Sequence, residues 1–394
     1  MKTYSSLANP EYEARPFVDF SGVTPRTDLS RLNFNWREKD LPERERTKHV
    51  HRLHPYLGKF VPQLAEIFLR KYAGRAVCDP FAGSGTTLVE ATTLGLDAVG
   101  ADVSAFNCLL AKVKTDKYDL PELEAEARKL LCDFDSAARG LPGGARGEGP
   151  NDAGEYLKRW YHPLSLRELL AFRGLLSGLR HEDLFKVVLC RAARSARLAP
   201  HHELDAPNEP VLGPYACRKH LRTCRPTVGA AKFIRRYLPD ALARVRVYSA
   251  LRRDVRVCIR HGDARRIELP SFDTIVTSPP YVGLIDYHEQ HRYAYELLRL
   301  PRNDDSEIGP AKGGSSSGAK ERYRAGIVEV FRNCAKSLAS GGHVVVVVGD
   351  RHDLYRGMHE DCGFRLAGRF ERHVNRRTGR RNSDFFESIL VWRK

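Results

Sequence analysis

The stretch RAVCDPFAGSGTTLVEA, from Arg75 to Ala91, sets the expectation for the fold. A short apolar run, Arg75–Pro80, leads into a turn that holds Gly83 and Gly85, and a helical pattern follows from Thr86 to Leu94. Glycines let a turn adopt positive φ and let a ligand approach the backbone, and a helix N-terminus offers free N–H groups. This strand, turn and helix predict the first unit of an α/β sheet, with a ligand beyond the strand's carboxyl end.

Further short apolar runs predict the other strands of the sheet. They are Asp97–Val103, Val255–Arg260, Phe272–Thr277 and His343–Gly349, with Phe364–Phe370 and Glu387–Trp392 near the end of the chain. Helical patterns such as Tyr323–Leu338 lie between many of them, and this alternation indicates a parallel α/β sheet. The last two runs are expected to form a closing antiparallel pair.

The alternation is interrupted in the middle of the chain, which predicts an insertion. From Tyr118 to Arg253 the pattern is mostly helical, and Leu141–Gly154 and Arg302–Lys320 have the composition of loose linkers. We therefore divide the chain into an N-terminal extension (1–47), a first catalytic part (48–117), a helical insertion (118–254) and a second catalytic part (255–394).

Composition and charge limit the classes of partner and the cellular compartment that fit this chain. The 394 residues carry a formal charge of +16, which favours a polyanionic partner such as nucleic acid. The chain has no long apolar run and no secretory pattern at its start, so we expect an intracellular, cytoplasmic protein. Nine scattered cysteines suggest reduced thiols.

One group of cysteines and histidines raises the question of a metal site. Cys217 and Cys224 flank His220, and His201 and His202 lie upstream. The six-residue gap between the cysteines matches no common zinc knuckle, so no metal site is predicted.

Three cofactors compete for the glycine turn. A triphosphate loop would carry Lys before Thr86, where Gly85 stands, and a dinucleotide loop would carry a third glycine. S-adenosylmethionine has no phosphate, and its positive groups suit a carboxylate such as Asp79. Asp102 follows the second strand at about the spacing of a ribose-binding carboxylate, and Asp263 follows the third, where it could meet the adenine. Each aspartate could instead cap a helix, but three at successive strand ends favour a nucleoside site.

DPFAGSGTT followed later by TSPPY resembles the amino-directed DNA methyltransferases, which modify exocyclic nitrogens of cytosine or adenine. HPYLGKFVPQL, His54–Leu64, is similar to the family's motif that closes over the methionine end of the cofactor. The resemblance covers His51–Asp116 and Val255–Lys394. It implies a Rossmann-like seven-stranded sheet, S-adenosylmethionine as cofactor, and target recognition by the helical insertion. The implied cofactor-binding residues are His54, Lys59, Phe60, Asp79, Phe81, Ala82, Gly83, Ser84, Gly85, Thr86, Asp102, Val103, Asp263, Ala264 and Thr277.

The TSPPY motif suits methylation of a base amino group, a poor nucleophile because its lone pair is delocalised. The Ser278 hydroxyl and the Pro279 carbonyl are candidate acceptors for the amino hydrogens, Pro280 stiffens the corner, and Tyr281 offers a face for an extruded base. In the family, Ser at this position usually accompanies N4 methylation of cytosine, and Asp or Asn accompanies N6 methylation of adenine. Carbon-5 methylation needs a Pro-Cys dipeptide, and none occurs here.

The expected substrate is double-stranded DNA in a prokaryotic cytoplasm, where the protein would be associated with the nucleoid. Whether a cognate restriction endonuclease accompanies the chain stays open, as do N6-adenine methylation, an RNA substrate and a catalytically silent, nucleic-acid-binding relative. The basic stretch Arg372–Arg381 is expected on a hairpin between the last two strands. Its phosphate-contact candidates are Arg376, Arg377, Arg380 and Arg381.

Overall fold

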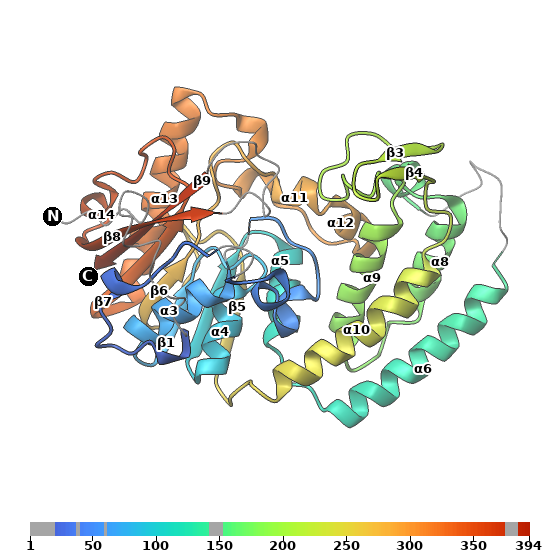
Figure 1. Ribbon diagram of the computed structural model, residues 1–394, viewed down its shortest axis with the longest axis horizontal. Coiled ribbons are helices and arrows are strands. Elements are labelled where there is room, and N and C mark those ends of the chain that lie inside the picture. Colours follow the sequence, from blue (N-terminus) through green and yellow to red (C-terminus); the bar gives the residue numbers. More distant parts are fainter. Residues whose placement is uncertain (1–19, 37–39, 59–60, 142–152, 375–384) are drawn as a thin grey trace.

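The computed structural model describes residues 20–36, 40–58, 61–141, 153–374 and 385–394. Its centre is one seven-stranded sheet in the order β5-β2-β1-β6-β7-β9-β8 (Figure 1). The strands are β1 (Ala76–Asp79), β2 (Asp97–Asp102), β5 (Val257–His261), β6 (Phe272–Thr277), β7 (Leu338–Val348), β8 (Arg365–Val374) and β9 (Phe385–Arg393). β5, β2, β1, β6 and β7 are parallel, and β9 is antiparallel to both of its neighbours. The predicted seven-stranded, Rossmann-like sheet is confirmed.

Both faces of the sheet are covered, which makes three layers (Figure 1). Along β7, Val345 and Val347 join the core under α3 (Pro62–Tyr72) and α4 (Thr86–Leu94). The alternate residues of β7 join the core under α13 (Ser317–Ser337) on the opposite face. Because successive side chains of a strand point to opposite faces, an unbroken valine run is what a strand buried on both sides requires.

The described part of the N-terminal extension belongs to the first of these cores. Phe34 is fully buried and stacks on Phe68 of α3, with ring centroids 6.0 Å apart. It also lies 5.8 Å, centroid to centroid, from Phe370 of β8. The extension therefore ties the antiparallel end of the sheet to α3.

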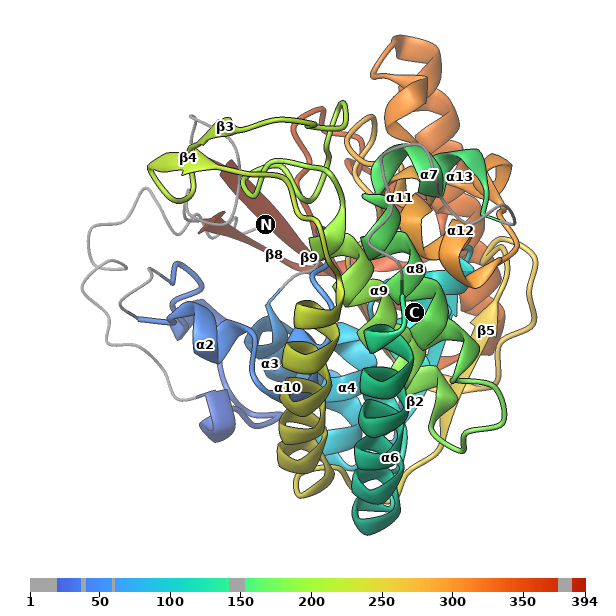
Figure 2. The ribbon, with the colours of Figure 1, turned by 90° about the vertical axis from the view of Figure 1, so that its right-hand side faces the viewer.

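The helical insertion packs beside the sheet (Figure 2). It contains α6 (Leu120–Arg139), α7 (Glu155–Trp160), α8 (Pro163–Gly174), α9 (Glu182–Ala196) and α10 (Ala231–Ser249), with a small hairpin of β3 (Tyr215–Cys217) and β4 (Arg222–Cys224). Its buried side chains form one continuous core with Val50, Phe106 and Leu110 of the first catalytic part and with Tyr293 of the second. Phe106 and Leu110 lie on α5 (Ala105–Thr115), and Tyr293 lies on α12 (Arg292–Leu298).

The remaining elements are short. They are η1 (Phe20–Gly22), η2 (Leu29–Arg31), α2 (Glu43–Arg46), η3 (His49–Arg52), α11 (Tyr287–Gln290), η4 (Asp304–Ser306), η5 (Ala311–Gly313) and α14 (Met358–Asp361). Among the described residues, no helix has both the length and the apolar character that crossing a bilayer demands.

Two sequence expectations need correction. The helix expected at Tyr323 starts at Ser317, because the Ser316 side chain caps it by accepting from the Ala319 N–H. Arg302–Lys320 is therefore not a loose linker throughout. The other predicted linker is Leu141–Gly154, and its residues 142–152 lie outside the described residues.

Strand β8 continues to Val374, so Arg372 is part of the sheet. It is buried, with Nε 3.2 Å from Glu387 Oε2, and is not a free basic group of the hairpin.

Candidate active site

A pocket of about 810 Å³, open mouth included, lies at the carboxyl edge of the parallel strands. Parallel strands all present their carboxyl ends at the same edge, so residues far apart in sequence converge there. Twelve of the predicted site residues line this pocket: Asp79, Phe81, Ala82, Gly83, Ser84, Thr86, Asp102, Val103, Asp263, Ala264, Ser278 and Pro280. The glycine turn and the TSPPY motif thus share one cavity.

Asp79 ends β1 and is almost fully buried. One of its carboxylate oxygens, Oδ1, accepts from the Thr277 hydroxyl at 2.6 Å and from the Phe81 N–H at 3.1 Å. Burial raises the pKa of Asp79 to about 6, against the effect of these hydrogen bonds. The contact with Thr277 also connects the end of β1 to the residue before Ser278. A cationic group in the pocket would stabilise the ionised form of Asp79.

Asp102 ends β2 and organises the glycine turn. Its Oδ2 accepts from the Gly83 N–H at 2.8 Å, and its Oδ1 accepts from the Ser104 N–H at 2.8 Å and from Asn107 Nδ2 at 3.0 Å. Burial raises the pKa of this carboxyl too. Asp102 is therefore more than a ligand acceptor, since it also fixes the position of the backbone beside it.

The two glycines of the turn have different surroundings. Gly83, at φ +48°, lines the pocket, and a Cβ there would lie 3.0 Å from the Tyr56 hydroxyl. Gly85, at φ +81°, does not line it, and a Cβ there would lie 3.0 Å from the backbone Cα of Ala111 on α5. Gly85 therefore permits the close packing of the turn against α5, whereas Gly83 borders the cavity. Buried Lys114 supports the same turn by donating to the Ser84 carbonyl at 2.9 Å.

The Pro-Pro corner after β6 is fastened at two points. Tyr323 of α13 donates its hydroxyl to the Pro280 carbonyl at 2.8 Å, and the hydroxyls of Tyr323 and Tyr355 are 2.7 Å apart. Tyr281 donates its hydroxyl to Glu387 of β9 at 3.1 Å. Pro279 is buried and, like Tyr281, is not part of the pocket lining. These contacts hold the corner in one conformation beside the cavity.

Other predicted residues lie away from the pocket or outside the described residues. His54 is fully buried and does not line the cavity. Its Nδ1 donates to the Pro55 carbonyl at 2.7 Å, and its Nε2 lies 3.1 Å from the Tyr293 hydroxyl. Burial lowers its pKa well below the usual range, so the ring is neutral. Both nitrogens contact the protein, and a role of His54 in the cofactor site stays a prediction from the family resemblance. Lys59, Phe60, Arg376, Arg377, Arg380 and Arg381 lie outside the described residues.

Several residues that line the pocket were not predicted from the sequence. They are Tyr56, Gly58, Asn107, Gly262, Tyr287, Ser306, Glu307 and Ile308, together with Pro80 of the glycine turn. Tyr56 and Gly58 stand inside the quoted HPYLGKFVPQL motif, which could have identified them. No sequence pattern marked the loop that carries Glu307.

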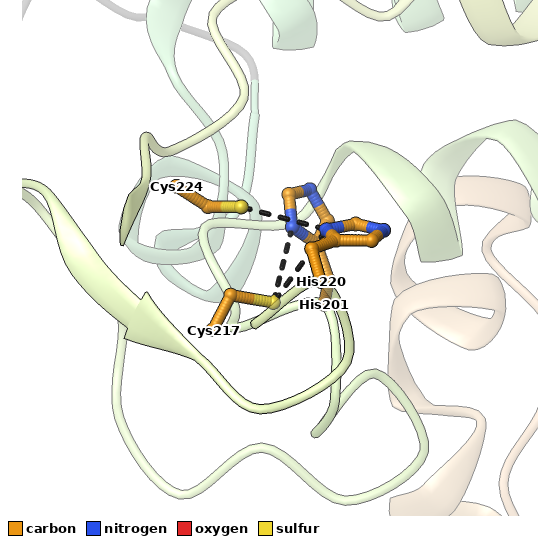
Figure 3. Close-up of side chains that lie close together, drawn as sticks. All are labelled: His201, Cys217, His220 and Cys224. Atoms are coloured by element: carbon orange, nitrogen blue, oxygen red, sulfur yellow. Dashed lines mark hydrogen bonds between the residues drawn. The ribbon is translucent and has the colours of Figure 1, made fainter. Parts of the chain in front are cut away.

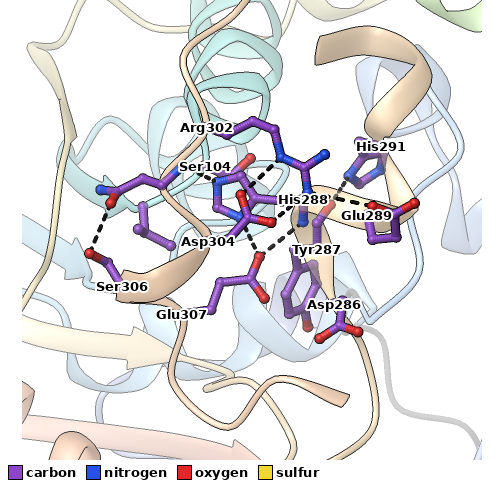
Figure 4. Close-up of polar contacts among 12 residues, drawn as sticks. Ser104, Asp286, Tyr287, His288, Glu289, His291, Arg302, Asp304, Ser306 and Glu307 are labelled. Atoms are coloured by element: carbon purple, nitrogen blue, oxygen red, sulfur yellow. Dashed lines mark hydrogen bonds and ion pairs between the residues drawn. The ribbon is translucent and has the colours of Figure 1, made fainter. Parts of the chain in front are cut away.

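The loop from Arg302 to Ile308 is held against α11 beside the pocket (Figure 4). His288 Nε2 accepts from the Asn303 N–H at 3.2 Å, so the ring proton is on Nδ1, which faces Glu307. The same Glu307 carboxylate accepts from the His288 N–H at 2.9 Å. Arg302 pairs with Asp304 and lies 3.5 Å from Glu289, which closes the base of the loop.

The lining suits a nucleoside that carries a positive charge. Two carboxylates, that of buried Asp79 and that of half-buried Asp102, offer acceptors for an ammonium group and for ribose hydroxyls. Ser84 Oγ and Asn107 Oδ1 are buried polar atoms on lining residues, and neither has a hydrogen-bond partner within the described part of the chain. Buried polar groups are rarely left without a partner, so these two atoms point to a polar ligand. The residues present therefore fit S-adenosylmethionine.

Comparison with known proteins agrees with this geometry. No family model matches the chain. The Type II methyltransferase M.MjaII of Methanocaldococcus jannaschii is 35% identical over 430 aligned positions, which cover 89% of this chain and 81% of that protein. The Type II methyltransferase M.MvaI of Kocuria varians is 24% identical over 280 positions, which cover 66% of this chain and 60% of that protein.

Solved structures show weaker likeness. TrmN from Thermus thermophilus is 14% identical with a TM-score of 0.32, covering 86% of this chain and 50% of that one. The rRNA methyltransferase aviRa from Streptomyces viridochromogenes has the same identity and TM-score, and the match covers 86% of this chain and 88% of that one. TM-scores this low carry no weight for the fold, which rests on the strand order of the sheet. By its identity to M.MjaII across most of both chains, the protein belongs to the amino-directed, S-adenosylmethionine-dependent DNA methyltransferases of the TSPPY type.

Proposed function

We propose that this methyltransferase modifies double-stranded DNA at the N4 amino group of a cytosine that is turned out of the helix into the pocket. The observation that carries the proposal is that Ser278 and Pro280 line the same cavity as Asp79 and Asp102. The Ser278 hydroxyl, which could accept a hydrogen bond from a base, therefore stands beside groups that could hold a cofactor. Methyl transfer requires that proximity, because the reacting atoms must lie in line.

In this proposal the carboxylates position the cofactor, which supplies a methyl group activated by its attachment to a sulfonium. Asp79 pairs with the α-amino group, Asp102 accepts from the ribose hydroxyls, and Asp263 and Ala264 border the adenine. Asp263 is itself held by Arg265, whose Nη2 lies 2.7 Å from Oδ2. The remaining predicted contacts come from the glycine turn. Lys59 and Phe60 stay predictions from the family resemblance.

The TSPPY motif activates the base. The Ser278 hydroxyl and the Pro279 carbonyl accept from the two amino hydrogens, which favours a pyramidal nitrogen and stabilises the positive charge that develops on it. The contacts of Pro280 with Tyr323 and of Tyr281 with Glu387 keep these acceptors in place, so little reorganisation is needed during the reaction. Tyr281 is the proposed stacking surface for the extruded base.

Cytosine is favoured over adenine because a serine stands at the first position of the motif, as the family resemblance implies. Carbon-5 methylation stays disfavoured, since the chain has no Pro-Cys dipeptide. The charge of +16 supports a polyanionic substrate, and we assign target recognition to the insertion, residues 118–254. Arg376, Arg377, Arg380 and Arg381 are proposed to contact phosphates.

The test is mass-spectrometric nucleoside analysis of DNA from cells that express the parent chain or its Ser278→Ala variant. The expected result is N4-methylcytosine with the parent and its loss with the variant, while the purified variant binds S-adenosylmethionine as the parent does. N6-methyladenine in its place would overturn the choice of base and keep DNA as substrate. Modified RNA with unmodified DNA would overturn the substrate, and no modified base with intact cofactor binding would favour a silent relative.

A further inference from the structure

The insertion brings two cysteines and two histidines together at a place far from the pocket in sequence. The hairpin of β3 and β4 carries Cys217, His220 and Cys224, and His201 comes from the segment after α9. Figure 3 shows the four side chains pointing toward one another. Their ligand atoms all lie within 4.8 Å of one another.

We propose a structural zinc site in the insertion, with four ligands that we call the Cys2His2 cluster: His201, Cys217, His220 and Cys224. A site with four protein ligands has no open position for water or substrate, which is the character of a structural centre. The proposal does not depend on the methylated base, and it replaces our expectation that the chain has no metal site.

The distances within the Cys2His2 cluster suit a tetrahedral centre. Cys217 Sγ lies 3.6 Å from His220 Nδ1 and 3.9 Å from His201 Nδ1, and His220 Nδ1 lies 3.4 Å from Cys224 Sγ. Typical Zn–S and Zn–N bonds at a tetrahedral angle separate sulfur from nitrogen by about 3.6 Å. Thiolates and imidazoles are therefore as far apart as one zinc ion would hold them. A two-iron cluster would instead place the thiolate pair and the imidazole pair on different metals.

The surroundings of the Cys2His2 cluster provide a second, independent observation. Between residues 201 and 229 the buried residues are Cys217, Cys224 and Thr227. Cys217 is 3% exposed and Cys224 8%, while Leu221, between them, is 90% exposed. A long segment without an apolar core of its own, and a two-stranded hairpin of three-residue strands, are not stable without a further constraint. Metal coordination supplies such a constraint in small modules.

Backbone conformation supports the same conclusion. Leu221 has φ +52°, in the left-handed region that is unfavourable for a residue with a Cβ. Its N–H donates to the Cys217 carbonyl at 2.8 Å, which closes the turn that aims His220 back at the cysteines. An exposed leucine gains no burial that would offset this strain. Coordination of a metal by His220 and Cys224, which lie on the two sides of Leu221 in sequence, would offset it.

In sequence, the six-residue gap between Cys217 and Cys224 does not match a zinc knuckle. The hairpin folds that gap back on itself, with Cys217 opposite Arg222 and Tyr215 opposite Cys224, so both thiols reach the same side. His201 lies outside the hairpin and is held against it, because its backbone N–H donates to the Tyr215 hydroxyl at 3.1 Å and its Nδ1 lies 2.8 Å from the same oxygen. The rings of His201 and His220 meet edge to face, with centroids 4.9 Å apart.

A second group of possible ligands among the described residues differs in two respects. His49, His51 and Glu90 also lie close together, but Lys48 Nζ lies 2.7 Å from Glu90 Oε2. The ammonium group already supplies the positive charge that a metal would bring. The group of His49, His51 and Glu90 also offers three ligands, whereas the Cys2His2 cluster offers the four of a closed tetrahedral site.

The experiment measures metal in the full-length chain, produced in zinc-supplemented medium and purified without chelator. We expect about one zinc ion per chain by elemental analysis, as for a closed four-ligand site. Replacement by cobalt(II) should give the intense visible bands of a tetrahedral centre and a thiolate charge-transfer band. His220→Ala, at an exposed ligand, and Cys217→Ser should each lose the bound zinc and the cobalt spectrum. Cys132→Ser, at an exposed cysteine on α6, is the matched control and should keep both.

Two further measurements separate loss of the metal from loss of the fold. The affinity of the ligand variants for S-adenosylmethionine should equal that of the parent, because the catalytic sheet does not include the hairpin. Arg218, Lys219 and Arg222 are already exposed, and chelation should release the backbone around them, so that trypsin cleaves there faster while cleavage at other sites stays unchanged. The proposal is overturned if the parent holds no zinc and gives no cobalt spectrum, if the ligand variants retain zinc, or if mass spectrometry finds Cys217 and Cys224 joined as a disulfide.

Discussion

At the scale of single residues, the buried carboxyl of Asp79 gives the site a dependence on pH. Burial raises its pKa to about 6 in the free protein. Only the ionised form attracts an ammonium group, so affinity for S-adenosylmethionine should be full above pH 6 and fall as the pH drops below it, approaching tenfold per pH unit. Calorimetric titrations across this range measure the effect. Asp79→Asn should bind weakly with a flat profile, and an unchanged slope in that variant would assign the titration to another group.

Tyr323 is a positioning residue for the proposed reaction, because it holds the Pro280 carbonyl without lining the pocket. Tyr323→Phe removes one hydrogen bond, worth about 0.5–1.5 kcal/mol, so kcat should fall by about twofold to tenfold. The KM for S-adenosylmethionine should stay the same. Tyr355→Phe is the control, since it leaves the bond to Pro280 in place. Equal losses in both variants would mean that general packing, and not the position of the corner, limits the rate.

At the scale of the element, the turn from β1 to α4 combines two functions that a pair of substitutions can separate. Gly85→Ala places a Cβ against the backbone of α5 at positive φ, so it should lower the free energy of unfolding by at least about 1–2 kcal/mol. Gly83→Ala also stands at positive φ, but it meets a side chain, Tyr56 at the pocket, and not backbone, so it should cost less stability and should weaken cofactor binding more. Denaturant titration and calorimetry measure the two effects. A larger loss of stability at Gly83 would reverse the assignment.

The hairpin between β8 and β9 is the element proposed to contact DNA phosphates. Changing Arg376 and Arg377 to Gln should weaken binding to target and random duplexes alike, and should lower the salt slope by about one per lost contact. Arg75 and Arg256, which are exposed and precede β1 and β5 at the edge of the sheet opposite the pocket, provide a control with the same change in charge. A loss confined to the target duplex would instead make the hairpin a reader of bases.

At the scale of the whole molecule, the insertion and the catalytic sheet share a core and should unfold together. Val50, Leu53, Val89, Phe106 and Leu110 of the first catalytic part are buried in the same cluster as the helices of the insertion. Exposing them would cost on the order of 10 kcal/mol, comparable to the stability of a typical domain. Calorimetry should show one transition, and a chain without residues 118–254 should lack a cooperative transition. Two separate transitions in the parent would contradict a shared core.

The sheet and half of the pocket could be predicted because both depend on local pattern. An apolar strand, its following turn and the next helix are contiguous, and the carboxyl edge is where such turns meet. Glu307, Tyr323 and Glu387 could not be predicted, since each reaches the site from a distant element through contacts that leave no periodicity in sequence. The Cys2His2 cluster was missed for the same reason. His201 lies outside the hairpin, and the spacing of the cysteines does not reveal a fold that brings them together.

The order of the strands has a consequence for synthesis on the ribosome. β1 lies between β2 and β6 in the sheet, yet β6 follows β2 only after the whole insertion has been translated. Until then the nascent chain presents one unpaired edge of β1, with Val77 and Cys78 open to other chains. Because the insertion shares its core with α5, its helices can shield part of this early intermediate while translation continues. The arrival of β6 then pairs the exposed edge and places Ser278 beside Asp79 in the same step.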